Sequence, residues 1–369
     1  MKIGILTFQF GNNFGALLQC YALHKYLNSV GHTAQIIDYT PGNINKRSLW
    51  KQIISRKFSI SHLKKIALKE KYAKQQNINF ERFREKYFIR TKSLNYHQLS
   101  KLENFDAIIV GSDQVWNPSQ HELGSYFLSH LDKYKGLRIS YAPCCAINNV
   151  ETKNKQKIIE ALRNFSLISV RNEETRKFVE ELTNINPPIV LDPTFLWSFN
   201  NEIPSLRLIS ENYILIYVLG KEIEGGHENI LKYIDKKYQN HKKVAVVLTD
   251  NNPQLFPWAD KVFYMADPID WLNLFYYANI IYTDSFHGLV FAIKFEKPFI
   301  AYYAELNRAS RFIDMSNRFI EISNHIISNS KDIVRNGVMD FDIDYKNLNQ
   351  KLEHEITFSK NFLAKSLNE

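Results

Sequence analysis

One histidine of this sequence stands where a strand is expected to end and a helix to begin. Residues 278–282 form a short apolar run typical of a buried strand, and residues 289–293 continue as an apolar helix, with His287 between them. Free backbone N–H groups at a helix start attract anions, and Ser285 can cap them. The segment from Ser285 to Gly288 is therefore expected to bind a phosphate or a carboxylate. The alternative is a helix cap followed by a core histidine, but similar polar residues at other strand ends favour a functional site.

A cationic residue occupies a comparable junction earlier in the chain. Arg171 lies between a predicted strand at 167–170 and a predicted helix at 173–181. A guanidinium group can hold a carboxylate or a phosphate through two parallel hydrogen bonds, so Arg171 could clamp such a group across a cleft. The alternative is a surface ion pair with Glu173 or Glu174.

Further polar and aromatic candidates follow strands in the first half of the chain. Asp113 comes after the predicted strand at 105–110, where its carboxylate could hydrogen-bond or deprotonate a hydroxyl group, or cap the next helix. Asn12 and Asn13 lie in a glycine-rich turn that could contact a ligand but does not match the dinucleotide-binding pattern. Trp116 could stack on a sugar, although core packing is usual for tryptophan.

These residues are expected to be positioned by parallel sheets, because short apolar strands alternate with helical stretches along the chain. The predicted strands are 2–8, 33–39, 105–110, 138–142, 167–170 and 188–191, then 213–219, 243–248, 261–264, 280–283 and 298–301. Ligands of open α/β sheets bind outside the carboxyl ends of the strands, so the strand ends are expected to border one cleft. Asp192 and Pro193 are interpreted as a turn at the domain edge rather than as part of the chemistry.

The length of the chain predicts more than one core. A chain of 369 residues suits two domains of comparable size. The stretch 197–212 is polar, contains Pro204 and lacks periodicity, so it is the expected linker. We expect a first α/β domain at 1–198, a second at 212–344, and a helix at 345–369 that packs across a domain.

Composition excludes several classes of protein. A hydrophobic content of 45% and an aromatic content of 14% are typical of a well-packed soluble protein. The first residues do not have the pattern of a signal peptide, and no run approaches the roughly 18 to 20 apolar residues of a membrane span, so a cytoplasmic location is expected. The three cysteines lack metal-site or redox spacing, so neither a metal site nor cysteine catalysis is expected.

The positive charge of the chain is concentrated in one segment. The net charge is +9, and residues 45–92 hold fifteen Lys or Arg against three Asp or Glu. Apolar residues among these charges suit amphipathic helices, which bind anionic membranes through apolar insertion and about 1 kcal/mol per surface cation. The alternative is the solvated basic face of an inserted helical pair. No nucleic-acid-binding motif accompanies the segment, so nucleic acid is not an expected partner.

Five segments at strand ends resemble the polysaccharide pyruvyl transferase family, and the resemblance covers most of the chain. They are Gly11–Ala16, Gly111–Asn117, Ser169–Glu173, Leu191–Thr194 and Thr283–Gly288. The resemblance implies two facing α/β domains arranged as in GT-B glycosyltransferases, with the active site in the cleft between them. It also implies transfer of an enolpyruvyl group from phosphoenolpyruvate to two hydroxyls of one sugar, forming a cyclic pyruvate ketal on a bacterial surface polysaccharide or its lipid-linked precursor.

The resemblance also suggests roles for the candidate residues. His287 would bind the donor and deliver a proton, since histidine exchanges protons near neutrality. The expected donor ligands are Arg171, Ser285, His287, Gly288 and Arg308. The expected acceptor-binding residues are Asn12, Asn13, Asp113 and Trp116, with Asp113 also a catalytic candidate. Arg308 and Arg311 are three residues apart and share a helix face, so a surface pair with Asp314 or Glu305 is the alternative. No cofactor is expected besides phosphoenolpyruvate as co-substrate.

Two other functions are compatible with the same features. A glycosyltransferase of the same two-domain shape would use a nucleotide sugar in place of phosphoenolpyruvate. A non-catalytic glycan-binding protein would leave Arg171 and His287 without a charged donor. If the acceptor is a lipid-linked sugar, the basic segment at 45–92 is expected to bring the protein to the inner face of the cytoplasmic membrane.

Overall fold

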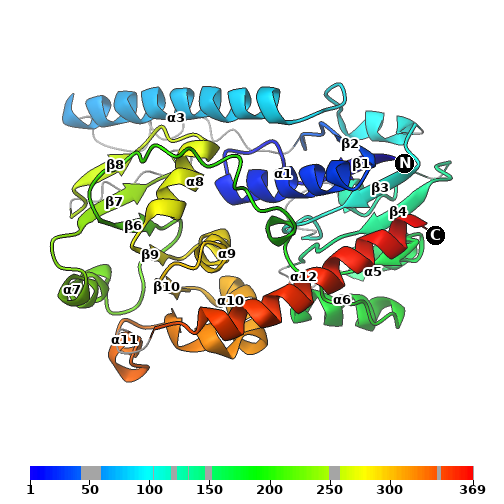
Figure 1. The fold of residues 1–369 in the computed structure, drawn as a ribbon. Helices are drawn as coiled ribbons and strands as arrows, with labels where there is room; N and C mark the ends of the chain where they lie inside the picture. The colour runs from blue at the N-terminus through cyan, green and yellow to red at the C-terminus, as the bar shows by residue number, and fades with distance from the viewer. Residues whose placement is uncertain are drawn as a thin grey trace.

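The computed structural model describes residues 1–42, 60–102, 104–117, 123–131, 133–145, 152–248, 258–338 and 342–368. Within these ranges the chain forms two separate sheets whose strand pairs are all parallel (Figure 1). Each sheet is buried on both faces. In β6, for example, Ile214 and Ile216 enter one core cluster, whereas Leu215 and Tyr217 enter another. Burial on both faces explains why the strands are continuous apolar runs without alternation.

The first sheet has five strands in the order β2-β1-β3-β4-β5. They are β1 (Lys2–Leu6), β2 (Thr33–Ile36), β3 (Ala107–Val110), β4 (Leu137–Ser140) and β5 (Leu167–Ile168). A sixth strand was expected at 188–191, but the structure has only an isolated bridge there, between Val170 and Ile189. Pro187 and Pro188 lack the N–H groups that a longer ladder would need.

The second sheet has six strands in the order β11-β10-β9-β6-β7-β8. They are β6 (Tyr213–Tyr217), β7 (Lys242–Val246), β8 (Lys261–Phe263), β9 (Ile280–Thr283), β10 (Phe299–Tyr302) and β11 (Ile326–Ile327). The first five were predicted within one or two residues at their starts. The edge strand β11 was not, because two residues carry no detectable pattern.

Helices cover both sheets, and several of them begin at a side-chain cap. The first part of the chain contains α1 (Phe14–Ser29), α3 (Ile60–Tyr87), η1 (Tyr96–Lys101), α4 (Leu123–Tyr126), α5 (Thr152–Arg163), α6 (Glu173–Thr183) and η2 (Pro193–Leu196). The second part contains α7 (His227–Lys237), α8 (Pro268–Tyr277), α9 (Phe286–Lys294), α10 (Leu306–Arg318), η4 (Ile320–His325), α11 (Asp332–Arg335) and α12 (Tyr345–Asn368). Asp267 caps α8 in a capping box with Asp270, and Pro268 follows at the first helical position.

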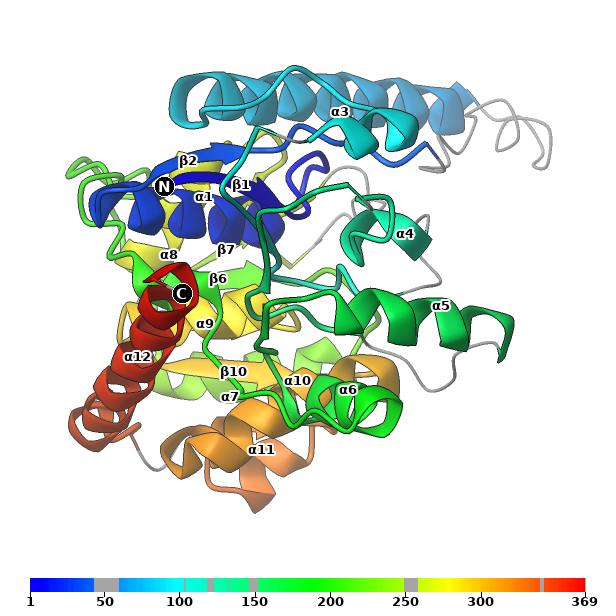
Figure 2. The ribbon, with the colours of Figure 1, turned by 90° about the vertical axis from the view of Figure 1, so that its right-hand side faces the viewer.

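Helix α3, the described part of the basic segment, lies along one side of both domains (Figures 1 and 2). The Gln76 side chain donates to the carbonyl of Val247 in the second domain at 3.0 Å, and Tyr72 stacks on Tyr264. Phe80 and Phe83 are buried in the core. The inner face of α3 is therefore engaged with protein, and a membrane could meet only its outer face. Residues 45–59 lie outside the described residues. None of the helices in the described ranges is both long enough and apolar enough to cross a membrane.

Helix α12 returns from the second domain to the first (Figure 1). At its start the Tyr345 hydroxyl donates to the carbonyl of Lys297 at 2.6 Å. Further along, the Ser359 hydroxyl accepts from the backbone N–H of Leu191 at 2.9 Å, and Leu363 is buried in the core of the first sheet. The C-terminal helix thus joins both domains.

Candidate active site

The start of α9 faces the loops that follow the strands of the first sheet. The side chain of His287 is buried, and its Nε2 lies 3.5 Å from Oδ2 of Asp192, which belongs to the first domain. This is an ion-pair distance when the imidazole is protonated. The contact places His287 at the interface between the domains and gives it a carboxylate partner that was not predicted.

Gly15, near the start of α1, allows this close approach. A Cβ atom at Gly15 would lie 2.2 Å from Cγ and from Nδ1 of the His287 ring. Ordinary van der Waals contacts are about 3.4–4 Å, so no larger residue fits here without displacing the imidazole. The first domain therefore packs directly on the histidine from two directions, through α1 and through Asp192.

Arg171 lies at the centre of the site and uses all three of its nitrogens. Its Nη1 donates to Oδ2 of Asp192 at 2.7 Å and its Nη2 to Oδ1 of Asp113 at 3.2 Å. Its Nε donates to Sγ of Cys144 at 2.9 Å. Burial alone would lower the pKa of Arg171, but these neighbours more than offset burial and raise it, so the guanidinium stays charged. The predicted alternative, a surface pair with the glutamates of α6, is not found.

Asp192 is held on both carboxylate oxygens. Its Oδ1 accepts from the backbone N–H of Thr194 at 3.1 Å and from the Thr194 hydroxyl at 2.8 Å. Its Oδ2 faces Arg171 and His287. Burial would raise the pKa of this carboxyl, yet the charges of His287 and Arg171 and the bonds from Thr194 hold it well below its usual value. The interpretation of Asp192 as a turn residue was incomplete, because it caps η2 and also belongs to the site.

Asp113 supplies the second buried carboxylate. Its backbone φ of 73° lies in the left-handed region, which is uncommon for residues other than glycine and is often found at functional sites. Burial opposes ionisation of Asp113, but the charges of Arg171, His287 and Arg311 lower its pKa. The structure therefore brings Asp113 to the same site as His287 and Arg171, as an ionised group.

A second arginine reaches the site from α10. The Cζ atoms of Arg171 and Arg311 lie 4.7 Å and 5.5 Å, respectively, from the centroid of the Phe286 ring. Such contacts between a cation and an aromatic face stabilise the position of the guanidinium. For Arg308, the predicted donor ligand, the side chain lies outside the described residues. Arg311, one helical turn later, is the described residue of this pair that reaches the site.

We call Asp113, Arg171, Asp192, His287 and Arg311 the interface cluster. The domains also meet beside it, where the backbone N–H of Glu173 donates to Asp314 of α10 at 3.2 Å, and the Ser310 hydroxyl to Glu174 at 2.8 Å. The carboxylate of Glu174 is thus engaged with α10, and that of Glu173 pairs with Arg176 at 2.7 Å.

The other residues of the histidine segment shape the start of α9. The Ser285 hydroxyl accepts from the backbone N–H of Gly288 at 3.3 Å, which is a helix cap. The Thr283 hydroxyl donates to the carbonyl of Tyr217 at 2.7 Å, and Asp284 accepts from the backbone of Leu219 at 2.6 Å. Ser285 and Gly288, which were expected to bind the donor, therefore bond to each other in this arrangement.

Three predicted acceptor residues, Asn12, Asn13 and Trp116, bond to or pack on neighbouring residues of the protein. Asn13 caps α1 by accepting from the backbone N–H of Ala16 at 3.2 Å, and the Asn12 side chain donates to that of Asn77 on α3. Trp116 is fully buried and stacks on Phe127. The indole is therefore a core residue in this structure and not a sugar platform, which corrects the prediction. Its position after a strand was compatible with either role.

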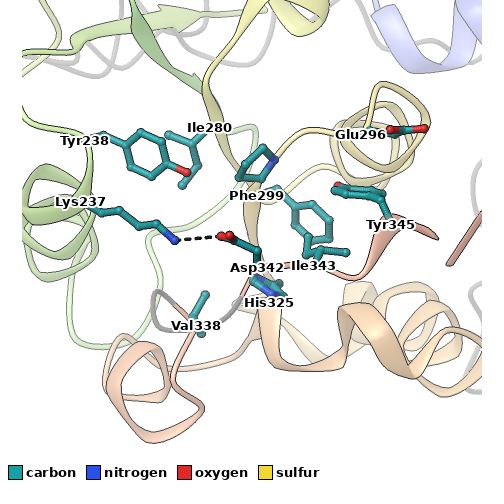
Figure 3. Close-up of a pocket in the computed structure, with 11 residues that line it drawn as sticks. Lys237, Tyr238, Ile280, Glu296, Phe299, His325, Val338, Asp342, Ile343 and Tyr345 are labelled. Carbon is teal, nitrogen blue, oxygen red and sulfur yellow. Dashed lines mark hydrogen bonds and ion pairs between the residues drawn. The ribbon is translucent and has the colours of Figure 1, made fainter. Parts of the chain in front are cut away.

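Among the residues that the structure describes, the cavity beside the cluster is small. The cavity lined by Arg171, Asp192, Phe286 and Arg311 measures about 10 Å³, room for about one water molecule. A larger cavity of about 200 Å³ lies at the opposite edge of the second sheet, where β9 and β10 begin, and its rim carries the ion pair of Lys237 with Asp342 (Figure 3).

Several solved structures share the fold at low sequence identity. The UDP-GlcNAc 2-epimerase from Methanocaldococcus jannaschii is 12% identical over 93% of each chain, with a TM-score of 0.50. The UDP-N-acetylglucosamine 2-epimerase from Rickettsia bellii is 11% identical over 100% of this chain and 96% of its own, with a TM-score of 0.51. S. aureus MnaA in its structure with UDP is 13% identical over 96% and 90%, with a TM-score of 0.50. These similarities confirm the predicted GT-B-type arrangement.

Sequence comparison identifies the family. No curated protein matches the chain. The family model for polysaccharide pyruvyl transferase matches residues 13–304, a range that includes every member of the interface cluster except Arg311 and excludes the C-terminal helix. The chain therefore belongs to the polysaccharide pyruvyl transferase family.

Proposed function

We propose that the protein transfers the pyruvyl group of phosphoenolpyruvate to two hydroxyls of one sugar residue and forms a cyclic ketal. The observation that carries the proposal is the buried pair of His287 and Asp192, with Arg171 and Arg311 beside it, in a chain of this family. A proton-exchanging group among fixed cations suits a small donor that carries both a phosphate and a carboxylate.

The charge balance of the interface cluster supports an anionic donor. The two arginines and the two aspartates cancel in formal charge, so the cluster is neutral with a neutral imidazole and carries +1 when His287 is protonated. A donor with two or three negative charges therefore binds most favourably to the protonated form. This is also the form that can deliver a proton.

In the proposed reaction His287 gives its proton to the methylene carbon of phosphoenolpyruvate, which becomes the methyl group of the product. The first sugar hydroxyl adds to the neighbouring carbon. The proton that this hydroxyl loses replaces the one that the site gave to the methylene carbon. The second hydroxyl then displaces phosphate from the same carbon and closes the ring, and its proton leaves with the phosphate. One positioned acid of this kind is typically worth a factor of about 10² to 10⁴ in rate.

Asp113 is better suited to hold the acceptor than to deprotonate it. Its lowered pKa, caused chiefly by Arg171, makes the carboxylate a weak base. It remains a strong hydrogen-bond acceptor for a sugar hydroxyl. We assign Asp113 to acceptor binding in the proposed reaction.

The acceptor is proposed to be a sugar on a membrane lipid or on a surface polysaccharide. The outer face of α3 exposes Lys71, Lys74, Arg82 and Lys86, which could contact an anionic membrane at its inner face. Flotation with vesicles of neutral and of anionic lipid tests this part. Equal flotation with both, or none, would contradict the membrane contact without affecting the proposed reaction.

The test of the reaction uses purified protein, phosphoenolpyruvate and candidate glycans. We expect phosphate release together with an acid-labile ketal, and loss of donor binding in His287→Ala. Binding is measured without an acceptor by thermal stabilisation, because a ligand at 100 times its Kd adds about 2.7 kcal/mol to the unfolding free energy. Stabilisation by a nucleotide sugar and not by phosphoenolpyruvate would instead identify a glycosyltransferase.

A further inference from the structure

Asp192 occupies a position that no other acidic residue of the interface cluster shares. Its two oxygens divide their partners, with Thr194 on Oδ1 and both Arg171 and His287 on Oδ2. The side chain is almost completely buried, and so are those of Arg171 and His287. A buried carboxylate fixed by so many contacts has little freedom to move, so it can determine where its partners lie.

We propose that Asp192 is a positioning residue that orients the His287 ring and holds it as the imidazolium when the two domains close. This inference rests on the proposed function, in which the protonated histidine serves the donor. Because Asp192 belongs to the first domain and His287 to the second, the pair forms only in the closed arrangement. Asp192 would act through the histidine and through Arg171, without itself touching the reacting atoms.

The other groups around His287 do not replace Asp192. The charged groups near the ring are Asp192 before η2, Asp113 after β3, Arg171 after β5 and Arg311 on α10. Of the two carboxylates, Asp192 is the one with a direct ion-pair contact to the imidazole. Asp113 instead contacts Arg171 directly, at 3.2 Å. The two aspartates therefore share one arginine but differ in their relation to the histidine.

This difference supplies a matched pair of variants. Asp192→Asn and Asp113→Asn each remove one carboxylate from Arg171, but only Asp192→Asn removes the partner of His287. The readout is the Kd of phosphoenolpyruvate between pH 5 and 9. Phosphoenolpyruvate affinity is expected to fall as the pH rises. In Asp192→Asn this fall should occur at a pH lower than in the wild type by roughly one unit or more. Ionisation of the donor phosphate is common to all the proteins and does not affect the comparison.

A second pair of variants covers the case in which Asp192→Asn does not fold. Thr194→Val removes the hydroxyl that donates to Asp192 Oδ1 at 2.8 Å and leaves the carboxylate in place. We expect a smaller shift of the alkaline limb in the same direction, and Thr194→Ser should restore the wild-type profile. A residue that served only the fold would change the melting temperature without moving the pH profile.

A measurement on the ligand-free protein separates this inference from the proposed function. The ring signals of labelled histidine are followed by NMR against pH, and His287 is assigned by the signal lost in His287→Gln. A lower titration midpoint in Asp192→Asn or Thr194→Val than in the wild type supports the inference even if phosphoenolpyruvate does not bind. An unchanged midpoint and pH profile, or equal shifts in Asp192→Asn and Asp113→Asn, would overturn it. Failure of the wild type to bind phosphoenolpyruvate would overturn the proposed function alone.

Discussion

Replacing Gly15 by alanine tests whether the closed interface is the active one. The new Cβ would lie 2.2 Å from two atoms of the His287 ring, whereas ordinary contacts begin near 3.4 Å. The ring and the start of α1 must therefore separate by about 1.2 Å, the difference between these distances. A displacement of about 1 Å at a catalytic group can cost roughly 100-fold in rate. We expect kcat to fall by about this factor, because His287 is pushed away from Asp192 and the donor.

The stability of the fold should change much less. Alanine favours a helix over glycine by up to about 1 kcal/mol, which partly offsets an overpacking cost of about 1 to 3 kcal/mol. The assay compares phosphate release, phosphoenolpyruvate affinity and thermal unfolding. Gly11→Ala is the matched control, since a Cβ there meets nothing within 4 Å. If Gly15→Ala retains the activity of Gly11→Ala, the closed contact between α1 and His287 is not required for catalysis, and the closed interface is not the active one.

Three further variants test separate parts of the structure. Arg311→Ala should weaken phosphoenolpyruvate binding roughly 10- to 100-fold, because a hydrogen bond to a charged group contributes about 1.5 to 3 kcal/mol. In the same titration the control Arg335→Ala, on the exposed side of α11, should leave the Kd of phosphoenolpyruvate unchanged. Folding lowers the pKa of Asp113, so this carboxylate stabilises the fold at pH values above its unfolded pKa, near 3.9, and this stabilisation is lost as the pH falls further. In urea unfolding, Asp113→Asn should therefore lose less stability than the wild type below about pH 4. Trp116→Ala should lower the unfolding free energy by about 3 to 5 kcal/mol, measured by urea denaturation, because a buried indole is lost from the core; an unchanged midpoint would place the indole outside it.

The fold was largely predictable because its signals are local. Each predicted strand of the second sheet is a short apolar run between turn residues. The missing strand at 188–191 and the unpredicted β11 both involve only one or two ladder positions. Such short pairings depend on neighbouring strands and not on the residues themselves.

The site was predictable only in part because its contacts join distant segments. His287, Arg171 and Asp113 each follow a strand and carry chemically informative side chains, so position and residue type pointed to them. The role of Asp192 depends on a partner in the other domain, which no spacing along the chain reveals. Arg311 faces the cluster because of the rotation of α10, and a pattern of two arginines three apart does not state which of them faces inward.

The return of α12 to the first domain has a consequence for engineering. Leu363 and Leu367 share a core cluster with Ile3 and Ile5 of β1, so both ends of the chain belong to the same domain (Figures 1 and 2). In topological terms the second domain is an insertion within the first, joined at the stretch after η2 and at the start of α12. The second domain could thus be exchanged between family members through two junctions, while the terminal segments and the core of the first domain remain unchanged.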